Sequence, residues 1–383
     1  MANPQRGSTA IVGAATAGFK GVPGRSSVDL AGECALKALA EAGLTVQDVD
    51  GLFVCLPDDT LSGLTMSEYF GIRPKFTDNN RTGGSAFLTH TEIATMALNA
   101  GLIDVALICY GSNQRSSTGK LMSSARPFEY ESVYNPIFPA TSYALSAARY
   151  MSEYGATEEQ FAEVAVSARK WANLNPEAAM QGPLTVEDCM SSRMVSSPLK
   201  VRDCCLVTDG GAAVVMVRAD RAKDMPQKPV YLLGSAAATK HRNISTMDDF
   251  TVTAAVESGK RAHENAGTKP SDMDVVEIYD AFTINTILYL EDLGFVKKGE
   301  APAFIADGNI DPGGTLPVNT NGGGLSCNHP GMYGMFTIVE AVRQLRGEGG
   351  ERQVKGAELA LAHGSGGVLS SPVTNIFGTE ATL

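Results

Sequence analysis

The second half of this 383-residue sequence repeats the order of elements found in the first half. In the first half a helix-forming segment ends at Gly43, and in the second half a similar segment ends at Gly267, which is 224 residues later. Agreement at one offset over several positions restricts the chain to folds that are built from two similar halves. The same offset relates three further pairs: Asp48 and Asp272, Asp50 and Asp274, and Cys55 and Tyr279.

Each half alternates apolar strands with amphipathic helices, and a glycine-rich turn precedes the last helix of each half. Strands that alternate with helices predict βα units and a mixed sheet that is covered by helices. Two such halves predict an α/β protein stacked in the layers αβαβα. The expected strands are residues 8–14, 51–55, 105–110, 230–234, 275–279 and 357–363. The expected helices are residues 28–42, 85–100 and 252–265, and one that opens within 322–330 and ends near 345.

One segment of the first half does not follow the repeat. Residues 113–200 are richer in Ser, Pro, Asn and Met than the flanking chain, which predicts a loop insertion. The expected organisation is therefore an N-terminal half over residues 1–225, which contains the insertion, and a C-terminal half over residues 226–383. A chain of this length with 44% hydrophobic residues can bury a large core.

The composition excludes several classes of protein. The formal net charge is −11 and no basic run is present, so a nucleic-acid surface is not expected. No apolar run reaches ~18 residues, which predicts no membrane span, and the N-terminus lacks a signal peptide, which predicts a cytoplasmic location. The seven cysteines are scattered, which predicts reduced thiols, and without a CxxC or HExxH pattern no bound metal is expected.

Four segments, in order along the chain, carry a resemblance to a known family. They are residues 173–216, which contain Cys-Cys and Asp-Gly-Gly-Ala-Ala, then YDAFTINTILYLEDLGF (279–295), NTNGGGLSCNHPGMYG (319–334) and HGSGG (363–367). They resemble the loop domain, the His-Asp-Cys-Phe region, the Gly-His-Pro region and the closing glycines of the thiolase superfamily. Within that superfamily the chain is similar to sterol carrier protein X thiolases and to bacterial steroid side-chain aldolases. The resemblance implies the thiolase fold with an inserted loop domain.

The departures from the family pattern concern the reactive residues. Arg81 stands where the family has its nucleophilic cysteine, Tyr279 stands where it has a histidine, and His329 keeps the histidine of Gly-His-Pro. An arginine stays protonated and cannot be usefully acylated, so acyl transfer through position 81 is excluded. Arg81 is expected either to hold a thioester oxygen or substrate carboxylate, or to form a structural ion pair or be a solvated turn residue.

A site that can hold an acyl-CoA but has no nucleophile suits a retro-aldol reaction. In a 3-hydroxyacyl-CoA a base takes the hydroxyl proton, a ketone or aldehyde leaves, and the thioester accepts the developing negative charge. The products include acetyl-CoA or propionyl-CoA. This reaction needs no tightly bound cofactor, because CoA is part of the substrate.

The candidate residues follow from the motifs. The catalytic candidates are Tyr279, His329, Tyr333 and His363, and either Tyr279 or His329 can be the base. The substrate-binding candidates are Arg81, Gly323, Gly324, Gly364 and Gly366, since glycines let backbone approach a thioester closely. The alternative for these residues is structural: packed rings, hydrogen-bonded histidines and turn glycines. Cys327 is either a relocated nucleophile or a buried inert thiol.

Three functions remain open at this point. The first is a CoA-dependent aldolase. The second is a Claisen-type acyltransferase that uses Cys327 or another residue, and the third is a non-catalytic subunit that binds acyl-CoA or acts as a scaffold for an active partner. The resemblance also implies a homodimer, and a small partner protein made of a zinc ribbon and an OB-fold.

Overall fold

The computed structural model describes residues 5–120 and 129–383, and within them nine strands form one hydrogen-bonded sheet in the order β3-β2-β4-β7-β1-β8-β11-β10-β9. The first five strands in this order belong to the first half and the last four to the second half. The halves meet where Ala10 and Ile11 of β1 pair with Tyr231 and Val230 of β8. The bounds are β1 (Thr9–Lys20), β2 (Gly51–Val54), β3 (Phe76–Asp78), β4 (Ala106–Ser112), β7 (Asp209–Arg218), β8 (Val230–Ala237), β9 (Val275–Ile278), β10 (Leu359–Gly364) and β11 (Val373–Gly378).

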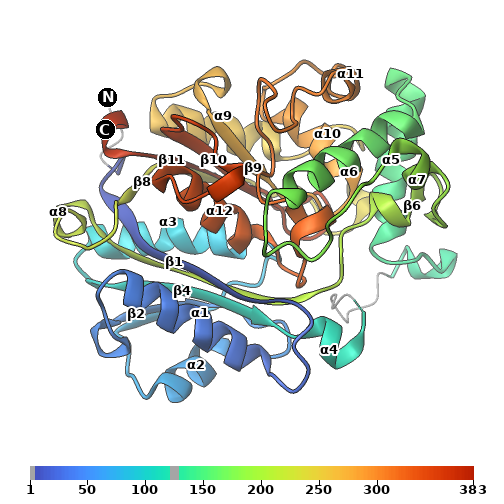
Figure 1. Cartoon of the computed structure of the whole chain (residues 1–383). Helices are drawn as coiled ribbons and strands as arrows, with labels where there is room; N and C mark the ends of the chain where they lie inside the picture. The colour runs from blue at the N-terminus through green and yellow to red at the C-terminus, as the bar shows by residue number, and fades with distance from the viewer. Residues whose placement is uncertain (1–4, 121–128) are drawn as a thin grey trace.

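The helices divide this sheet into the predicted layers (Figure 1). Helix α1 contacts only strands of the first half and α9 only strands of the second half, whereas α3 and α12 contact strands of both halves and so lie between them. The layer order αβαβα is therefore confirmed. The bounds are α1 (Ser27–Glu41), α2 (Ser62–Phe70), α3 (Ala86–Asn99), α8 (Ala219–Ala222), α9 (Ala255–Ala266), α10 (Thr283–Asp292), α11 (Ala301–Ala306) and α12 (Gly334–Arg346).

The repeat seen in the sequence is a repeat in the structure. An offset of 224 residues relates β2 to β9, and Asp50 and Asp274 make equivalent contacts in the two halves. Each carboxylate accepts two backbone N–H groups at the start of the neighbouring parallel strand. Asp50 accepts those of Asp104 and Val105, both at 2.9 Å, and Asp274 accepts those of Glu358 and Leu359, at 2.8 and 2.9 Å. These carboxylates align the strand ends in both halves.

Two predicted boundaries are wrong, and the first error concerns a candidate residue. The helix expected to open within residues 322–330 begins only at Gly334, as α12. It follows a π-helical turn, η6 (Gly323–Cys327), and an extended connection in which Asn328 has a φ of −163°. Proline disfavours helical conformation in the residue before it, and Pro330 therefore keeps His329 out of a helix. Strand β1 is also longer than residues 8–14, because its small residues continue to pair with β7 up to Lys20.

The insertion lies between β4 and β7, which are antiparallel neighbours in the sheet. It contributes no described strand to the large sheet and packs through α6 against η6, α10 and α11 (Figure 1). Its elements are α4 (Gln114–Thr118), α5 (Ala140–Tyr154), α6 (Glu158–Asn173), α7 (Val186–Met190), and the two-stranded sheet of β5 (Met194–Ser196) and β6 (Leu199–Lys200).

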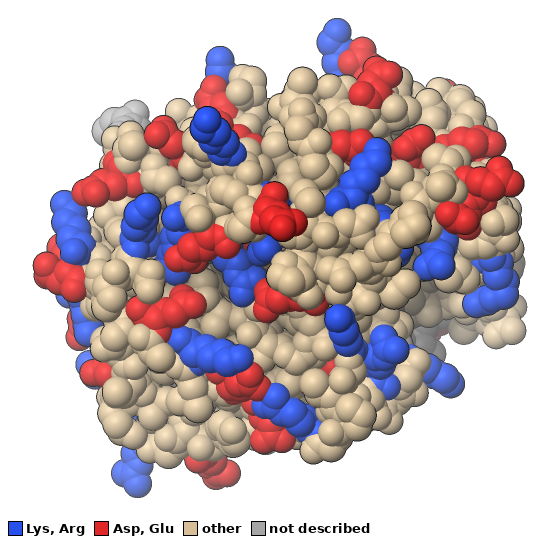
Figure 2. Space-filling view, in the orientation of Figure 1, with Lys and Arg blue, Asp and Glu red and all other residues tan. Residues whose placement is uncertain are grey.

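The surface charges are mixed on the face shown in Figure 2, where basic and acidic side chains are interspersed. Among the described residues, no helix is both long enough and apolar enough to cross a bilayer. Within the same ranges no three His, Cys, Asp or Glu side chains gather in a way that could hold a metal ion.

His90 of α3 provides a test of how the central layer responds to acid. Its ring is fully buried between Phe53 and Phe87, and burial lowers its pKa to about 3. The Asp78 carboxylate lies 3.7 Å from Nε2, beyond hydrogen-bond distance, and burial outweighs its attraction. In the unfolded chain the imidazole of His90 takes up a proton near pH ~6.5, whereas in the folded chain it stays neutral. The folded state therefore loses stability relative to the unfolded state as the pH falls below ~6.5.

We expect His90→Leu to remove this proton uptake. Relative to the wild type, the variant should gain about 1.4 kcal/mol in unfolding free energy for each pH unit below pH ~6. Urea unfolding at several pH values measures this difference. Equal pH slopes for the two proteins would show that His90 is not held neutral in the folded state.

Candidate active site

Two of the predicted residues form a hydrogen-bonded pair in the interior. The Tyr279 hydroxyl lies 2.9 Å from Nε2 of His329, and the two rings meet edge to face with centroids 5.6 Å apart. Tyr279 directly follows β9, whereas His329 lies in the extended connection before α12. Both side chains are buried, so the pair is shielded from water.

The first half of the chain holds the backbone around His329. The N–H of His329 donates to the Thr208 hydroxyl at 3.0 Å, and its carbonyl accepts the side-chain amide of Gln114 at 2.7 Å. The Tyr110 hydroxyl donates to the carbonyl of Pro330 at 2.5 Å. Residues at the ends of β4 and β7, in the first half, therefore position His329 of the second half. The geometry of the pair depends on both halves.

A third candidate, Tyr333, lies beside the pair. Its ring centroid is 5.8 Å from that of Tyr279 and 6.3 Å from that of His329, to which it is nearly parallel. Its hydroxyl donates to the side-chain oxygen of Asn321 at 2.9 Å. The structure thus brings three of the four predicted catalytic residues together, with the hydroxyl of Tyr333 turned toward Asn321.

Burial decides the protonation state of the pair. It raises the pKa of Tyr279 well above its usual range and lowers the pKa of His329 to about 4. At neutral pH both side chains are therefore uncharged, so Tyr279 carries a proton and His329 has a nitrogen that can accept one. The Tyr279 hydroxyl has a second hydrogen-bond acceptor in the carbonyl of Gly331, at 3.1 Å.

Glycines allow the start of α3 to pack directly against Tyr279, and the closing turn to pack against the start of α3. A Cβ on Gly84 would lie 2.0 Å from the ring of Tyr279, so only glycine fits there. A Cβ on Gly366 would lie 1.9 Å from the Thr82 carbonyl, and one on Gly364 would lie 3.3 Å from the carbonyl of Gly84. Gly364 and Gly366 therefore serve this close packing in the structure, while their contact with a thioester stays a prediction.

Arg81 lies just before this packing, and its guanidinium is engaged by the chain itself. One nitrogen donates to the carbonyls of Leu56 and Asp59, both at 2.7 Å, and the other donates to the carbonyl of Pro57 at 3.1 Å. In this structure Arg81 stabilises the turn after β2 through these hydrogen bonds. Its contact with a substrate stays a prediction.

His363 is the predicted residue that the structure does not bring to the pair. Its Nδ1 lies 2.9 Å from the Thr374 hydroxyl, and its ring lies 4.5 Å from that of Tyr289 in α10. The Thr374 hydroxyl in turn meets Ser258 of α9 at 2.9 Å, so the imidazole faces the outer helix layer. These contacts are those of a hydrogen-bonded structural histidine.

The sequence analysis missed a buried carboxyl group next to the pair. Asp280 follows Tyr279, accepts the N–H of Gly324 at 2.6 Å and that of Leu325 at 3.3 Å, and has a pKa that burial raises to about 7. Its carboxyl group occupies the space that a side chain on Gly323 would need. The signal was present in the motif that begins at residue 279, where an acidic residue follows an apolar strand.

Cys327 is buried and its thiol is not activated. Burial raises its pKa well above the usual range, and the Asn175 amide lies 3.5 Å from its sulfur. Its small neighbours are Ala172 and Ala178 of the insertion, which form a compact apolar cluster around it. All seven cysteines are free thiols, as predicted.

Comparison with known proteins shows similarity over nearly the whole chain. The family described as "Thiolase C-terminal domain-like" matches residues 236–379. A steroid side-chain-cleaving aldolase of Thermomonospora curvata is 38% identical over 89% of this chain and 91% of its own length. A 17-hydroxy-3-oxo-4-pregnene-20-carboxyl-CoA lyase of Mycobacterium tuberculosis is 36% identical over 95% of this chain and 98% of its own length. A solved structure described as Ltp2-ChsH2(DUF35) aldolase superimposes with a TM-score of 0.90, at 37% identity, over 98% of this chain and 99% of that one.

Proposed function

The chain belongs to the thiolase superfamily, and from this premise we propose that it is a CoA-thioester-dependent aldolase. It cleaves a 3-hydroxyacyl-CoA into a ketone or aldehyde and a shorter acyl-CoA. The observation that carries this proposal is the buried, uncharged Tyr279–His329 pair. The prediction that Arg81 stands at the nucleophile position supports it. The aldolase at 38% identity and the lyase at 36% identity support the same reaction class.

The reaction balances with the two side chains alone. The substrate's 3-hydroxyl gives up its proton, the bond between carbons 2 and 3 breaks, and carbon 3 becomes a carbonyl. The electron pair of that bond enters the thioester as an enolate, and carbon 2 then takes a proton. One proton is lost and one is gained, so the enzyme returns to its starting state without a metal or a redox partner.

The protonation states assign a role to each residue. His329 is neutral, and its Nε2 accepts the hydroxyl proton of the substrate. Tyr279 is a protonated phenol and supplies the proton or hydrogen bond that the enolate needs. The hydrogen bond between the two side chains lets the proton that His329 receives pass to Tyr279 and replace the proton that Tyr279 gives to the enolate.

The chemical identity of the acyl group is proposed by analogy with the relatives. The compound in the name of the Mycobacterium tuberculosis lyase has a hydroxyl group at position 17 and a CoA thioester on the side chain at position 20, so it is a 3-hydroxyacyl-CoA. We propose a steroid side-chain thioester of this kind as the first substrate to test. Cleavage of such a compound between carbons 17 and 20 releases propionyl-CoA.

The two other functions receive less support. An acyltransferase would need a reactive thiolate, and burial keeps the thiol of Cys327 protonated. A subunit that only binds acyl-CoA would not need an uncharged tyrosine and histidine in hydrogen-bond contact in its interior.

Incubation of the purified protein with 3-hydroxyacyl-CoA thioesters tests the proposal. We expect stoichiometric release of a ketone or aldehyde and a shorter acyl-CoA, and we expect the Cys327→Ala variant to retain this activity. Mass spectrometry of both products is the measurement. Loss of activity in Cys327→Ala, with a covalent acyl group on Cys327 in the wild type, would support the acyltransferase instead.

The assay should include the proposed partners. The related aldolase structure is described with a ChsH2(DUF35) component, and we propose a small zinc-ribbon and OB-fold protein of that kind as the partner of this chain. We also propose a cytoplasmic homodimer. Strand β3 lies at one end of the sheet order, where a second copy can extend the sheet.

A further inference from the structure

The two residues of the pair are carried by segments that meet at one carboxyl group. Asp280 is the neighbour of Tyr279, and its carboxyl group accepts the N–H of Gly324 at 2.6 Å and that of Leu325 at 3.3 Å. These two residues lie in η6, the turn that leads to His329. One side chain thus ties the end of β9 to the turn before the histidine.

The fit between this carboxyl group and the turn leaves no spare space. A Cβ on Gly323 would lie 2.0 Å from one carboxyl oxygen of Asp280, and a Cβ on Gly324 would lie 3.0 Å from the other. Gly323 has a φ of +63°, which glycine adopts without strain. The glycines therefore allow the backbone of the turn to approach the carboxyl group directly.

Movement of the turn would reach His329 through Gly324. A Cβ on Gly324 would lie 3.3 Å from Cδ2 of the imidazole, so the backbone at this residue forms one wall of the histidine's pocket. The N–H of Leu206 donates to the carbonyl of Gly324 at 2.9 Å and holds the same residue from the other direction. The position of Gly324 thus decides where the imidazole can lie.

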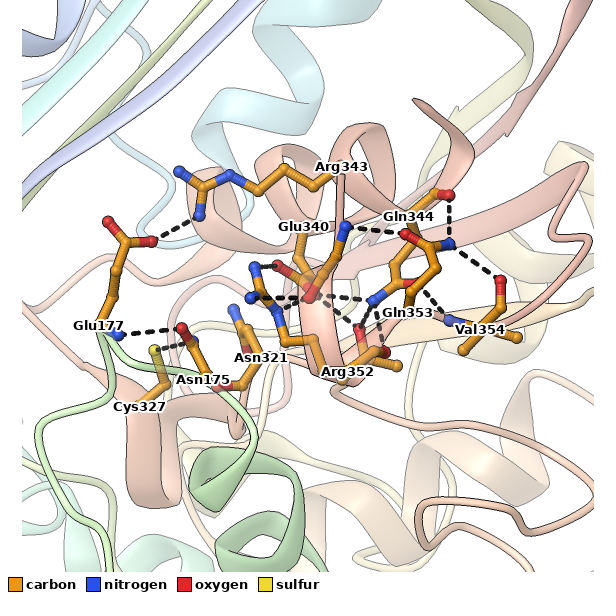
Figure 3. A network of polar contacts seen from close by, with 12 residues as sticks. Asn175, Glu177, Asn321, Cys327, Glu340, Arg343, Gln344, Arg352, Gln353 and Val354 are labelled. Atoms are coloured by element: carbon orange, nitrogen blue, oxygen red, sulfur yellow. Dashed lines mark hydrogen bonds and ion pairs between the residues drawn. The ribbon is translucent and has the colours of Figure 1, made fainter. Parts of the chain in front are cut away.

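The far end of the turn is held separately by the insertion. The N–H groups of Ala179 and Met180 donate to the carbonyls of Cys327 and Ser326 at 2.8 and 3.0 Å. Figure 3 shows Asn175 beside Cys327 in the same region, with the buried ion pair of Glu340 and Arg352 to their right in this view. The insertion therefore holds the exit of η6, and Asp280 holds its entrance.

From these contacts we propose that Asp280 is a positioning residue for the catalytic pair: by holding the entrance of η6 it sets how closely His329 approaches Tyr279. The proposal rests on the proposed function for its kinetic consequence but not for its geometric one. A displacement of about 1 Å in a reacting group lowers a rate by roughly 100-fold, which sets the size of the expected effect.

Three variants test the proposal by kinetics. We expect Asp280→Ala to lower kcat for cleavage about 100-fold while KM for the acyl-CoA changes less than about threefold. Asp280→Asn keeps one oxygen that can accept the N–H of Gly324, and should restore part of the lost kcat. Gly323→Ala should resemble Asp280→Ala, and the double variant should be no worse than either single variant, because both changes release the same contact.

A matched control separates positioning from general loss of stability. Asp292 is also buried and accepts the N–H and the hydroxyl of Thr253 at 2.7 and 2.8 Å, but it does not contact η6. Asp292→Asn should lower the melting temperature and leave kcat unchanged. If it lowers kcat as much as Asp280→Ala does, the effect at position 280 is one of stability and the proposal is overturned.

Crystal structures of the variants decide the geometric part independently of activity. We expect the distance between the Tyr279 hydroxyl and Nε2 of His329, 2.9 Å in the wild type, to increase in Asp280→Ala and to recover in Asp280→Asn. An unchanged distance in Asp280→Ala would overturn the proposal. If the wild type cleaves no 3-hydroxyacyl-CoA, the proposed function fails, while these distances still test the role of Asp280.

Discussion

Replacing Tyr279 with phenylalanine is expected to lower kcat for carbon–carbon cleavage by about 10²–10⁴-fold, the range in which a positioned acid or base contributes. The variant removes only the hydroxyl that lies 2.9 Å from His329 and 3.1 Å from the carbonyl of Gly331. The ring that packs against Gly84 remains, so the fold should persist. Steady-state formation of the shorter acyl-CoA, followed by liquid chromatography, measures the effect.

The control for this variant is another buried tyrosine that uses its hydroxyl. Tyr150 of α5 donates to the carboxylate of Glu291, away from the pair. Tyr150→Phe should cost stability of about 1 kcal/mol or more, because the buried carboxylate loses a donor, but should leave kcat unchanged. Undiminished cleavage by Tyr279→Phe would remove Tyr279 from the mechanism.

Replacing His329 with glutamine is expected to have an effect of at least about 10³-fold on kcat. The glutamine amide can still hydrogen-bond to Tyr279, but it cannot accept the hydroxyl proton of the substrate. Binding of the acyl-CoA should change little, since the side chain keeps its polar character, so KM should stay within a few-fold of the wild type. A variant that keeps its kcat would show that the base lies elsewhere.

The pH profile of the wild type adds an independent signature of His329. Burial lowers its pKa to about 4, so the base stays unprotonated through the neutral range. In the wild type, protonation of Asp280, whose pKa burial raises to about 7, should cause a partial decrease near neutral pH. In Asp280→Asn, which removes this titration, we expect kcat/KM to stay level as the pH falls from 8 to about 5 and to decline only as the pH approaches about 4. An ordinary histidine base would instead produce a decline near pH ~6.5, and that result would contradict the assigned environment.

The sequence was informative about the site wherever a motif kept its spacing. Tyr279, His329 and Tyr333 were identified by their places in two motifs, and the structure brings these three side chains together. His363 was identified in the same way, but a strand directs successive side chains to opposite faces, and this one faces Thr374 and the outer helices. Motif position therefore located the residue without giving its direction.

The contacts that Asp280 and Arg81 make could not be predicted from the sequence, for a different reason. Each acts through backbone groups that are distant in sequence: Asp280 through N–H groups of Gly324 and Leu325, and Arg81 through carbonyls of the turn at residues 56–59. Almost every residue has the same backbone N–H and carbonyl groups, so a pattern of residue types does not predict which of them a side chain will contact.

The sequence by itself determined the two-half architecture, and it predicted the loss of the thiolase nucleophile. The offset of 224 and the alternation of strands with helices are local patterns, and local patterns can be read along the chain. The position of Arg81 excludes acyl transfer there by its chemistry alone. Only the tertiary structure decided that Tyr279 and His329 meet and that both are uncharged. Their contact joins residues 50 positions apart, and their pKa values depend on burial by elements of both halves.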